Sequence, residues 1–121
     1  MLRSSVGGLA VWEPQTRRER ARGLLGRDGL APDEALLLRR CRSVHTFGMR
    51  FAIEVVLLDR DMQPFDVISM KPGRVLRPRR RVSHVLEVAA GCGRRLAQEI
   101  HDPVPGAVPA DTQPSTFGSK T

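Results

Sequence analysis

One run of eight residues, 51–58, constrains the fold of this chain most strongly. It reads FAIEVVLL and is rich in β-branched and aromatic side chains, which favour a strand. Both alternating faces of such a strand are apolar except at Glu54, and this pattern predicts a central strand that is covered on both sides. A sheet with other structure packed on each face is therefore the expected framework.

Shorter apolar segments before and after this run predict further strands. Residues 60–63 form a turn into a second strand at 65–70, so the two strands read as a hairpin. Additional strands are predicted at residues 6–12, 36–38 and 82–89. These short strands indicate a mainly β fold.

A capping-box pattern predicts a short helix at about residues 17–25. Thr16 can cap the first backbone N–H groups, and Glu19 can reach back to the cap. The pattern at residues 94–100 does not distinguish a helix from a strand. The expected architecture is a small antiparallel, sandwich-like open barrel with one short N-terminal helix.

The length of 121 residues suits a single domain. We expect this domain at residues 1–104, followed by a flexible tail at 105–121 that is rich in Pro, Gly, Ser and Thr. No apolar run approaches the roughly 20 residues that span a bilayer, and the N-terminus does not resemble a secretory signal. With only two cysteines, Cys41 and Cys92, a reduced cytoplasmic protein without membrane contact is predicted.

The formal net charge is +7, and the basic residues occur in several groups along the chain. The densest cluster consists of Arg74, Arg77, Arg79, Arg80 and Arg81. Nucleic-acid binders usually combine such charge with exposed aromatic rings for stacking, and this chain has no Tyr, one Trp and four Phe. A solvated basic face is the favoured interpretation, with an acidic protein or nucleic-acid partner as the alternative.

The segment 41–50, CRSVHTFGMR, concentrates His, Thr, Met and Cys between two apolar strands. Together with other blocks it resembles the uncharacterised bacterial and archaeal family called domain of unknown function 192. The blocks are RGLLGR at 22–27, VHTFGMRF at 44–51 running into EVVLLD at 54–59, and VLEVAAG at 85–91. The resemblance covers roughly residues 10–104 and implies a compact, mainly β, sandwich-like barrel, but no reaction.

Three positions depart from the family pattern. The family usually has Asp where this chain has Glu54, Gly where it has Met62 in the hairpin turn, and Gly where His101 precedes Asp102. The longer side chain of Glu54 shifts any contact of its carboxylate by about one methylene group, and His101 changes the residue that precedes Asp102.

Glu54 is the strongest individual candidate for a functional residue. Its apolar neighbours indicate burial, and a buried carboxylate must be paired or take up a proton. It could form a structural ion pair with Arg22 or Arg50, or it could line a ligand pocket. Glu87 poses the same question, although it shares a strand face with Ser83 and could be exposed.

His45 could act as an acid, a base or a ligand. No Ser or Cys nucleophile motif accompanies it, so a loop histidine bonded to backbone is the alternative. Cys41, His45 and Met49 are soft ligands of the kind that suits Cu(I). In an extended chain, however, each step of four residues spans about 13 Å. We therefore expect no metal and no cofactor.

The leading hypothesis is a non-catalytic module that binds a small molecule in a cleft. The cleft would be formed by the 43–50 loop, Glu54 and nearby Arg side chains. The candidate site residues are His45 and Thr46 as hydrogen-bonding groups, Phe47 and Met49 as an apolar wall, and Arg50 or Arg22 as a partner for Glu54 or an anionic ligand. An enzyme that uses His45 and Glu54 in acid–base chemistry is the second hypothesis, and a basic interaction module is the third.

Overall fold

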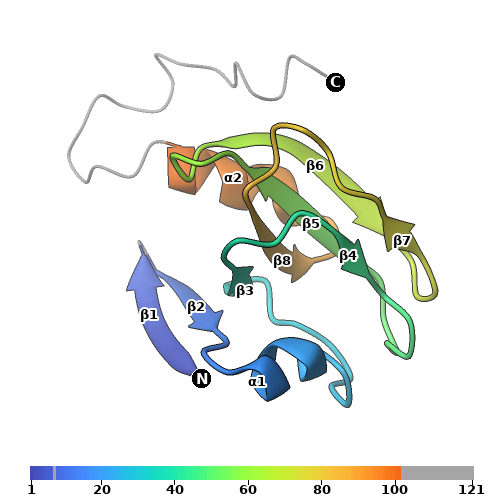
Figure 1. Cartoon of the computed structure of the whole chain (residues 1–121). Coiled ribbons are helices and arrows are strands. Elements are labelled where there is room, and N and C mark those ends of the chain that lie inside the picture. The colour runs from blue at the N-terminus through green and yellow to red at the C-terminus, as the bar shows by residue number, and fades with distance from the viewer. Residues whose placement is uncertain (7, 102–121) are drawn as a thin grey trace.

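The computed structural model describes residues 1–6 and 8–101, which form two sheets and two helices (Figure 1). The large sheet consists of β1 (Leu2–Val6), β2 (Leu9–Glu13), β3 (Glu34–Leu38), β5 (Ile53–Leu58), β6 (Pro64–Met70) and β8 (His84–Ala89). The small sheet pairs β4 (Val44–His45) with β7 (Val75–Leu76). The helices are α1 (Arg17–Arg22) and α2 (Gly93–His101).

The large sheet has the strand order β1-β2-β3-β8-β5-β6. Its neighbours are antiparallel except for β2 and β3, which run parallel. The sheet is therefore mixed, and the expectation of a purely antiparallel one is wrong. It is also open, with β1 and β6 at its edges, so a barrel is not confirmed. The mainly β character and the inner position of β5 are confirmed.

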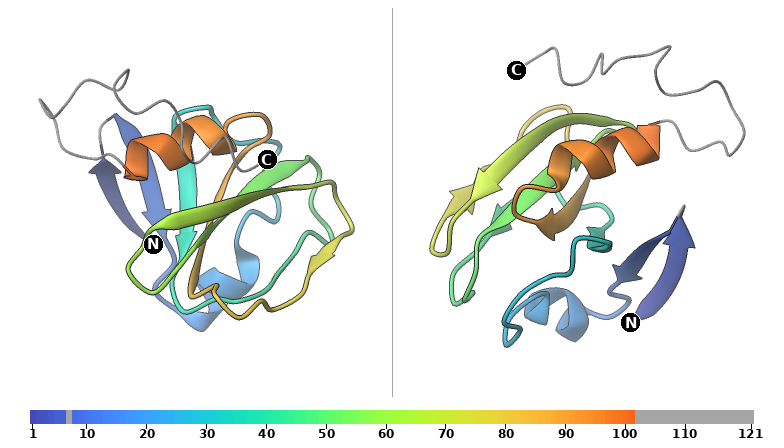
Figure 2. Two further views of the ribbon diagram at one scale, coloured as in Figure 1. Left: turned by 90° about the horizontal axis from the view of Figure 1, so that it is seen from above. Right: turned by 180° about the vertical axis from the view of Figure 1, so that it is seen from behind.

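Two clusters of buried side chains pack on opposite faces of this sheet. Figure 2 shows α2 lying across one face. On one side, which we call the α2 face, Leu96 and Ala97 of α2 are fully buried against alternate residues of β5 and β8. On the other side, the α1 face, the cover comes from Leu24, just after α1, and from Val44 of β4. This coverage explains why the strand at 51–58 is apolar on both faces.

Helix α1 starts as the sequence predicts but ends earlier. Thr16 and Glu19 form the capping box. Gly23 ends the helix after Arg22 with φ +49°, in the left-handed half of the backbone map where glycine is favoured. Because α1 follows two strands and α2 is a second, longer helix, the expectation of one short N-terminal helix is wrong.

Helix α2 includes residues 94–100, for which the sequence pattern did not distinguish a helix from a strand. Leu96, Ala97 and Ile100 lie on one side of it and pack on the sheet. The single strand expected at residues 6–12 is instead a hairpin of β1 and β2, in which Val6 pairs with Leu9. The two short strands β4 and β7 carry no apolar run of their own and are not predicted from the sequence.

The hairpin turn between β5 and β6 places Met62 in the left-handed region, at φ +64°. Its backbone N–H donates to the carbonyl of Asp59 at 3.0 Å. This is the position at which the resemblance expects glycine, and the backbone conformation there is the one that glycine adopts most easily.

The tail expected at residues 105–121 lies outside the described residues, as does Asp102. Within the described ranges, neither helix is long and apolar enough to cross a membrane. Cys41 and Cys92 are free thiols and pack on opposite faces of the sheet.

Candidate functional site

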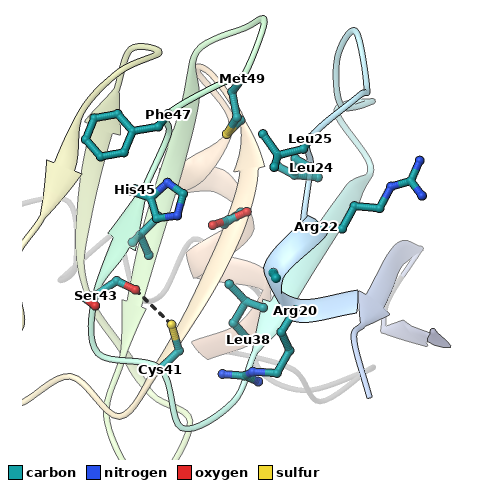
Figure 3. A pocket seen from close by; sticks show the side chains of 14 residues that line it. Arg20, Arg22, Leu24, Leu25, Leu38, Cys41, Ser43, His45, Phe47 and Met49 are labelled. Carbon is teal, nitrogen blue, oxygen red and sulfur yellow. Dashed lines mark hydrogen bonds between the residues drawn. The ribbon is translucent and has the colours of Figure 1, made fainter. Parts of the chain in front are cut away.

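A pocket of about 140 Å³ opens on the α1 face of the sheet (Figure 3). One wall is formed by residues 20–25, from α1 and the turn after it, and the other by residues 41–49. The sheet contributes Leu38 of β3 and Glu87 of β8. Half of the lining residues are apolar, and the polar groups among the rest decide what the pocket can bind.

Glu87 is the polar residue that the sheet places in this pocket. It lies opposite Leu36 of β3 and Val55 of β5, and it is only 5% exposed. The structure records no hydrogen bond or ion pair for its carboxylate within the described part of the chain. Among the described residues, every side-chain oxygen that is sealed from solvent has a hydrogen-bond partner. Because the carboxylate oxygens of Glu87 have none, they keep some contact with the pocket.

Burial without a partner changes the protonation of Glu87. The loss of hydration raises the pKa of its carboxyl group from 4.5 to about 7. Near neutral pH the group therefore exists in both protonation states, and it can donate or accept a proton. A buried carboxyl group with this property, facing a cavity, is a feature of functional sites.

Three of the predicted site residues lie on the wall opposite α1. His45 is exposed on β4, and its ring stacks on Phe47 with the ring centroids 5.3 Å apart. Phe47 is 52% exposed, whereas Met49 is partly buried against Leu24 and its neighbours. Figure 3 shows His45 and Phe47 across the pocket from Leu24 and Leu25.

Thr46 does not face the pocket. Its side chain is completely buried, and the hydroxyl donates to the carbonyl of Lys71 at 2.6 Å. The same hydroxyl accepts from the backbone N–H of Arg74 at 2.9 Å. Thr46 therefore links the pocket wall to the loop before β7 by hydrogen bonds, and this role is structural.

Two arginines and a cysteine complete the polar lining. The guanidinium groups of Arg20 and Arg22 have no ion pair in the described residues, and in Figure 3 Arg22 extends away from His45. The Cys41 thiol donates to the carbonyl of Ser43 at 3.0 Å. Burial raises the pKa of this thiol, so it stays protonated, unlike a metal-binding thiolate. Among the described residues, no three His, Cys, Asp or Glu side chains gather to hold a metal ion.

Glu54 lies on the α2 face, away from this pocket. Its Oε1 accepts from the backbone N–H of Gly93 at 2.6 Å, and its Oε2 accepts from the Ser69 hydroxyl at 3.3 Å. It thus stabilises the start of α2, where a negative charge is favourable. The structure does not bring Glu54 together with His45, Arg22 or Arg50.

Arg50 is also outside the pocket lining. It forms an ion pair of 2.8 Å with Asp28, and both side chains are mostly exposed. The basic cluster lies elsewhere, with Arg74 just before β7 and the other four arginines after it. In that cluster Arg79 pairs with Asp66 at 2.8 Å, and the guanidinium group of Arg81 lies 4.4 Å from the centre of the Phe65 ring. Binding of an acidic partner by this cluster stays a prediction.

Of the predicted site residues, His45, Phe47, Met49 and Arg22 line this pocket, whereas Glu54 lies on the other face and Glu87 is the glutamate in the interior. Ligand binding by these residues stays a prediction. The signal for Glu87 was present, because Val85, Leu86 and Val88 surround it with apolar residues on both faces, as in the strand of Glu54. Arg20 gave no such signal, and Cys41 was considered only as a soft metal ligand together with His45 and Met49.

Comparison with known proteins identifies relatives but no activity. A model of the family domain of unknown function 192, described as "Uncharacterized ACR", matches residues 4–105. Two UPF0127 proteins, from Pyrococcus horikoshii and Pyrococcus abyssi, are each 31% identical over 62 residues. The match covers 51% of this chain and spans about half the length of these relatives, 54% and 53%.

Two solved structures share the fold. A protein of unknown function from Novosphingobium aromaticivorans has a TM-score of 0.63 and 17% identity, covering 79% of this chain and 86% of its own. A putative transcription regulator from Sinorhizobium meliloti has a TM-score of 0.63 and 23% identity, with coverage of 78% and 82%. At these identities the likeness shows the fold alone.

Proposed function

Because the chain belongs to the uncharacterised family domain of unknown function 192, which brings no known activity with it, we propose from its pocket that it binds a small organic molecule there. The observation that carries this proposal is Glu87, a carboxyl group that is 5% exposed, has no partner among the described residues and faces a cavity. Leaving such a group unpaired costs stability, and a bound molecule would offset that cost.

The dimensions of the pocket limit the molecule. Cavities of roughly 150 Å³ take up a molecule as large as benzene, and this pocket has about 140 Å³. The apolar part of the ligand would lie against Leu24, Leu38 and Met49, while His45 and Phe47 border it on the side opposite α1.

The proposal is tested by screening small fragments against the isotope-labelled full chain by amide NMR. We expect hits to shift the backbone signals of Cys41, Ser43 and His45, which lie along one wall, and to leave that of Gly93 on the α2 face unchanged. Ala21 is exposed on α1 and lines the pocket, so the Ala21→Trp variant should lose these hits without disturbing the core. Shifts that persist in this variant, or a screen with no shifts along this wall, would contradict the proposal.

Acid–base catalysis in the same pocket is a second candidate, favoured by one observation. Glu87 has a pKa of about 7, which is near the working pH that suits a general acid or base. His45 lines the same pocket and is the other group able to transfer a proton. Turnover with a bell-shaped pH profile that is lost in Glu87→Gln would support this candidate, and binding without turnover would remove it.

A further inference from the structure

We propose that the molecule bound in this pocket is a small primary amine whose ammonium group becomes the partner that Glu87 lacks. This inference rests on the proposed function and names the chemical class of its ligand. It stands on the position of the carboxylate, on the lack of a three-residue metal-binding group among the described residues, and on the two arginines that line the pocket.

The carboxylate is held in place by the sheet. Glu87 lies in β8, which is paired on one side with β3 and on the other with β5, directly opposite Leu36 and Val55. Because the strand is inside the sheet, its backbone cannot turn the side chain out to solvent. A partner must therefore come to Glu87 through the pocket.

An ammonium group fits this carboxylate better than other partners. An ionised carboxylate only accepts hydrogen bonds, and a primary ammonium offers three donors on a compact charge. A metal ion needs several ligands, and no three His, Cys, Asp or Glu side chains come together in the described part of the chain. The apolar surroundings of Leu24, Leu38 and Val44 strengthen attraction to an organic cation, because charges interact more strongly away from water.

The other titratable and charged groups at the pocket limit the rest of the ligand. These groups are Arg20 and Arg22 from the α1 side and Cys41 and His45 from the opposite wall. The two guanidinium groups have no ion pair among the described residues, so they repel a second positive charge and attract a negative one. The ligand is therefore a monoamine whose far end is neutral or anionic, a class that includes short amino acids.

Binding of an ammonium group to Glu87 must depend on pH. The pKa of this carboxyl group is about 7, and only its ionised form attracts the amine. Since apparent affinity scales with the competent fraction, the affinity should rise about 30-fold between pH 5.5 and pH 8. An anionic ligand that shares the proton of Glu87 would show the opposite trend.

The test compares butylamine, 4-aminobutyrate and butyrate, titrated into the full chain at pH 5.5 and pH 8 and followed by the amide signals of the pocket wall. We expect both amines to bind at pH 8, to bind about 30-fold more weakly at pH 5.5, and to lose binding in Glu87→Gln. Butyrate should not bind. Tighter binding of 4-aminobutyrate than of butylamine, removed by Arg20→Gln, would assign the anionic end to Arg20.

Two control variants make the result specific. Glu54→Gln removes a carboxylate of the same type from the opposite face and should leave amine binding unchanged. His45→Gln should preserve the pH dependence, although histidine side chains also change charge near neutral pH; loss of the dependence in this variant would overturn the assignment to Glu87.

The failure of this inference is distinguishable from failure of the proposed function. If butyrate or an uncharged fragment binds at the pocket wall and the amines do not, the pocket is a binding site but the inference is wrong. Amine binding that persists in Glu87→Gln also overturns it. If neither these probes nor any fragment shifts the pocket wall, both proposals fail.

Discussion

Two glutamates in neighbouring strands of this protein have opposite environments. Glu54 of β5 lies opposite Val88, and Glu87 of β8 lies opposite Val55, so the two side chains point to different faces of the sheet. Glu54 accepts a 2.6 Å hydrogen bond from the N–H of Gly93, whereas the carboxylate of Glu87 has no partner in the described residues and its pKa is raised to about 7. The environment of a glutamate in the middle of a strand thus depends on what packs on its face of the sheet. A helix N-terminus gives Glu54 a hydrogen-bond donor, whereas the α1 face leaves Glu87 available for binding.

The two helices explain this difference. Helix α2 directs its first backbone N–H toward the sheet, where Glu54 can accept it. Helix α1 has no buried residue, and only Leu24 after it is fixed in the core. The α1 face is therefore covered loosely, and the space that is left is the pocket in front of Glu87.

The largest predicted effect comes from replacing Glu87. The folded protein holds this carboxyl protonated up to about pH 7, while the unfolded chain ionises it near 4.5. The wild type should therefore lose stability as pH rises from 4.5 to 7, by about 3 kcal/mol relative to Glu87→Gln. Urea denaturation of both proteins across pH 4 to 8 measures this difference, and parallel pH profiles would mean that Glu87 has a partner in solution.

The second prediction concerns the tight contact on the α2 face. A Cβ atom at position 93 would lie 2.6 Å from Val67 Cγ1 and 2.7 Å from Glu54 Oε1. Gly93→Ala should lower the free energy of unfolding by about 2 kcal/mol, as expected for overpacking. Gly29→Ala is the matched control, because nothing lies within 4 Å of its added Cβ. Equal stability of the two variants in urea would show that α2 is not held this closely.

A smaller loss is expected when Glu54 loses its charge. Glu54→Gln keeps an oxygen acceptor near Gly93 but removes the negative charge at the start of α2, which should lower stability by about 1 kcal/mol. At pH 8 this variant and Glu87→Gln should therefore change stability in opposite directions. Thermal denaturation at that pH compares them directly. Changes of the same sign would contradict the conclusion that Glu54 stabilises the fold while Glu87 destabilises it.

The smallest effect is predicted for Arg50→Ala. Its ion pair with Asp28 is exposed, with side-chain exposures of 63% and 88%, and such pairs contribute between nothing measurable and about 1 kcal/mol. Stability in urea should be nearly unchanged at both low and high salt. A larger loss would indicate that Arg50 acts on one of the two glutamates after all.

The sequence predicted those parts of the fold that depend on local pattern. The strand around Val55 and Val56, its hairpin partner and the capping box of Thr16 and Glu19 all follow from neighbouring residues. The hairpin of β1 and β2 was missed because β1 carries the polar residues Arg3, Ser4 and Ser5 in its middle, a composition that does not indicate a strand.

The interior of the site depends on contacts between distant residues and could not be predicted in the same way. Glu54 and Glu87 both stand in apolar strands, and the pattern of each is equally compatible with a pocket. Which of them gains a backbone donor depends on where α2 begins, 39 residues after Glu54. His45 and Met49 were recognised because their residue types are unusual together, not because the sequence showed what they face.

The position of β8 has a consequence for how the protein is made. This strand is the last of the sheet to leave the ribosome, yet it lies between β3 and β5. Before residues 84–89 emerge, the N-terminal strands and the β5–β6 hairpin have no strand to join them, and each presents an unpaired edge. Synthesis of β8 joins the two halves and adds Glu87, so the pocket is completed only when β8 has paired with both β3 and β5.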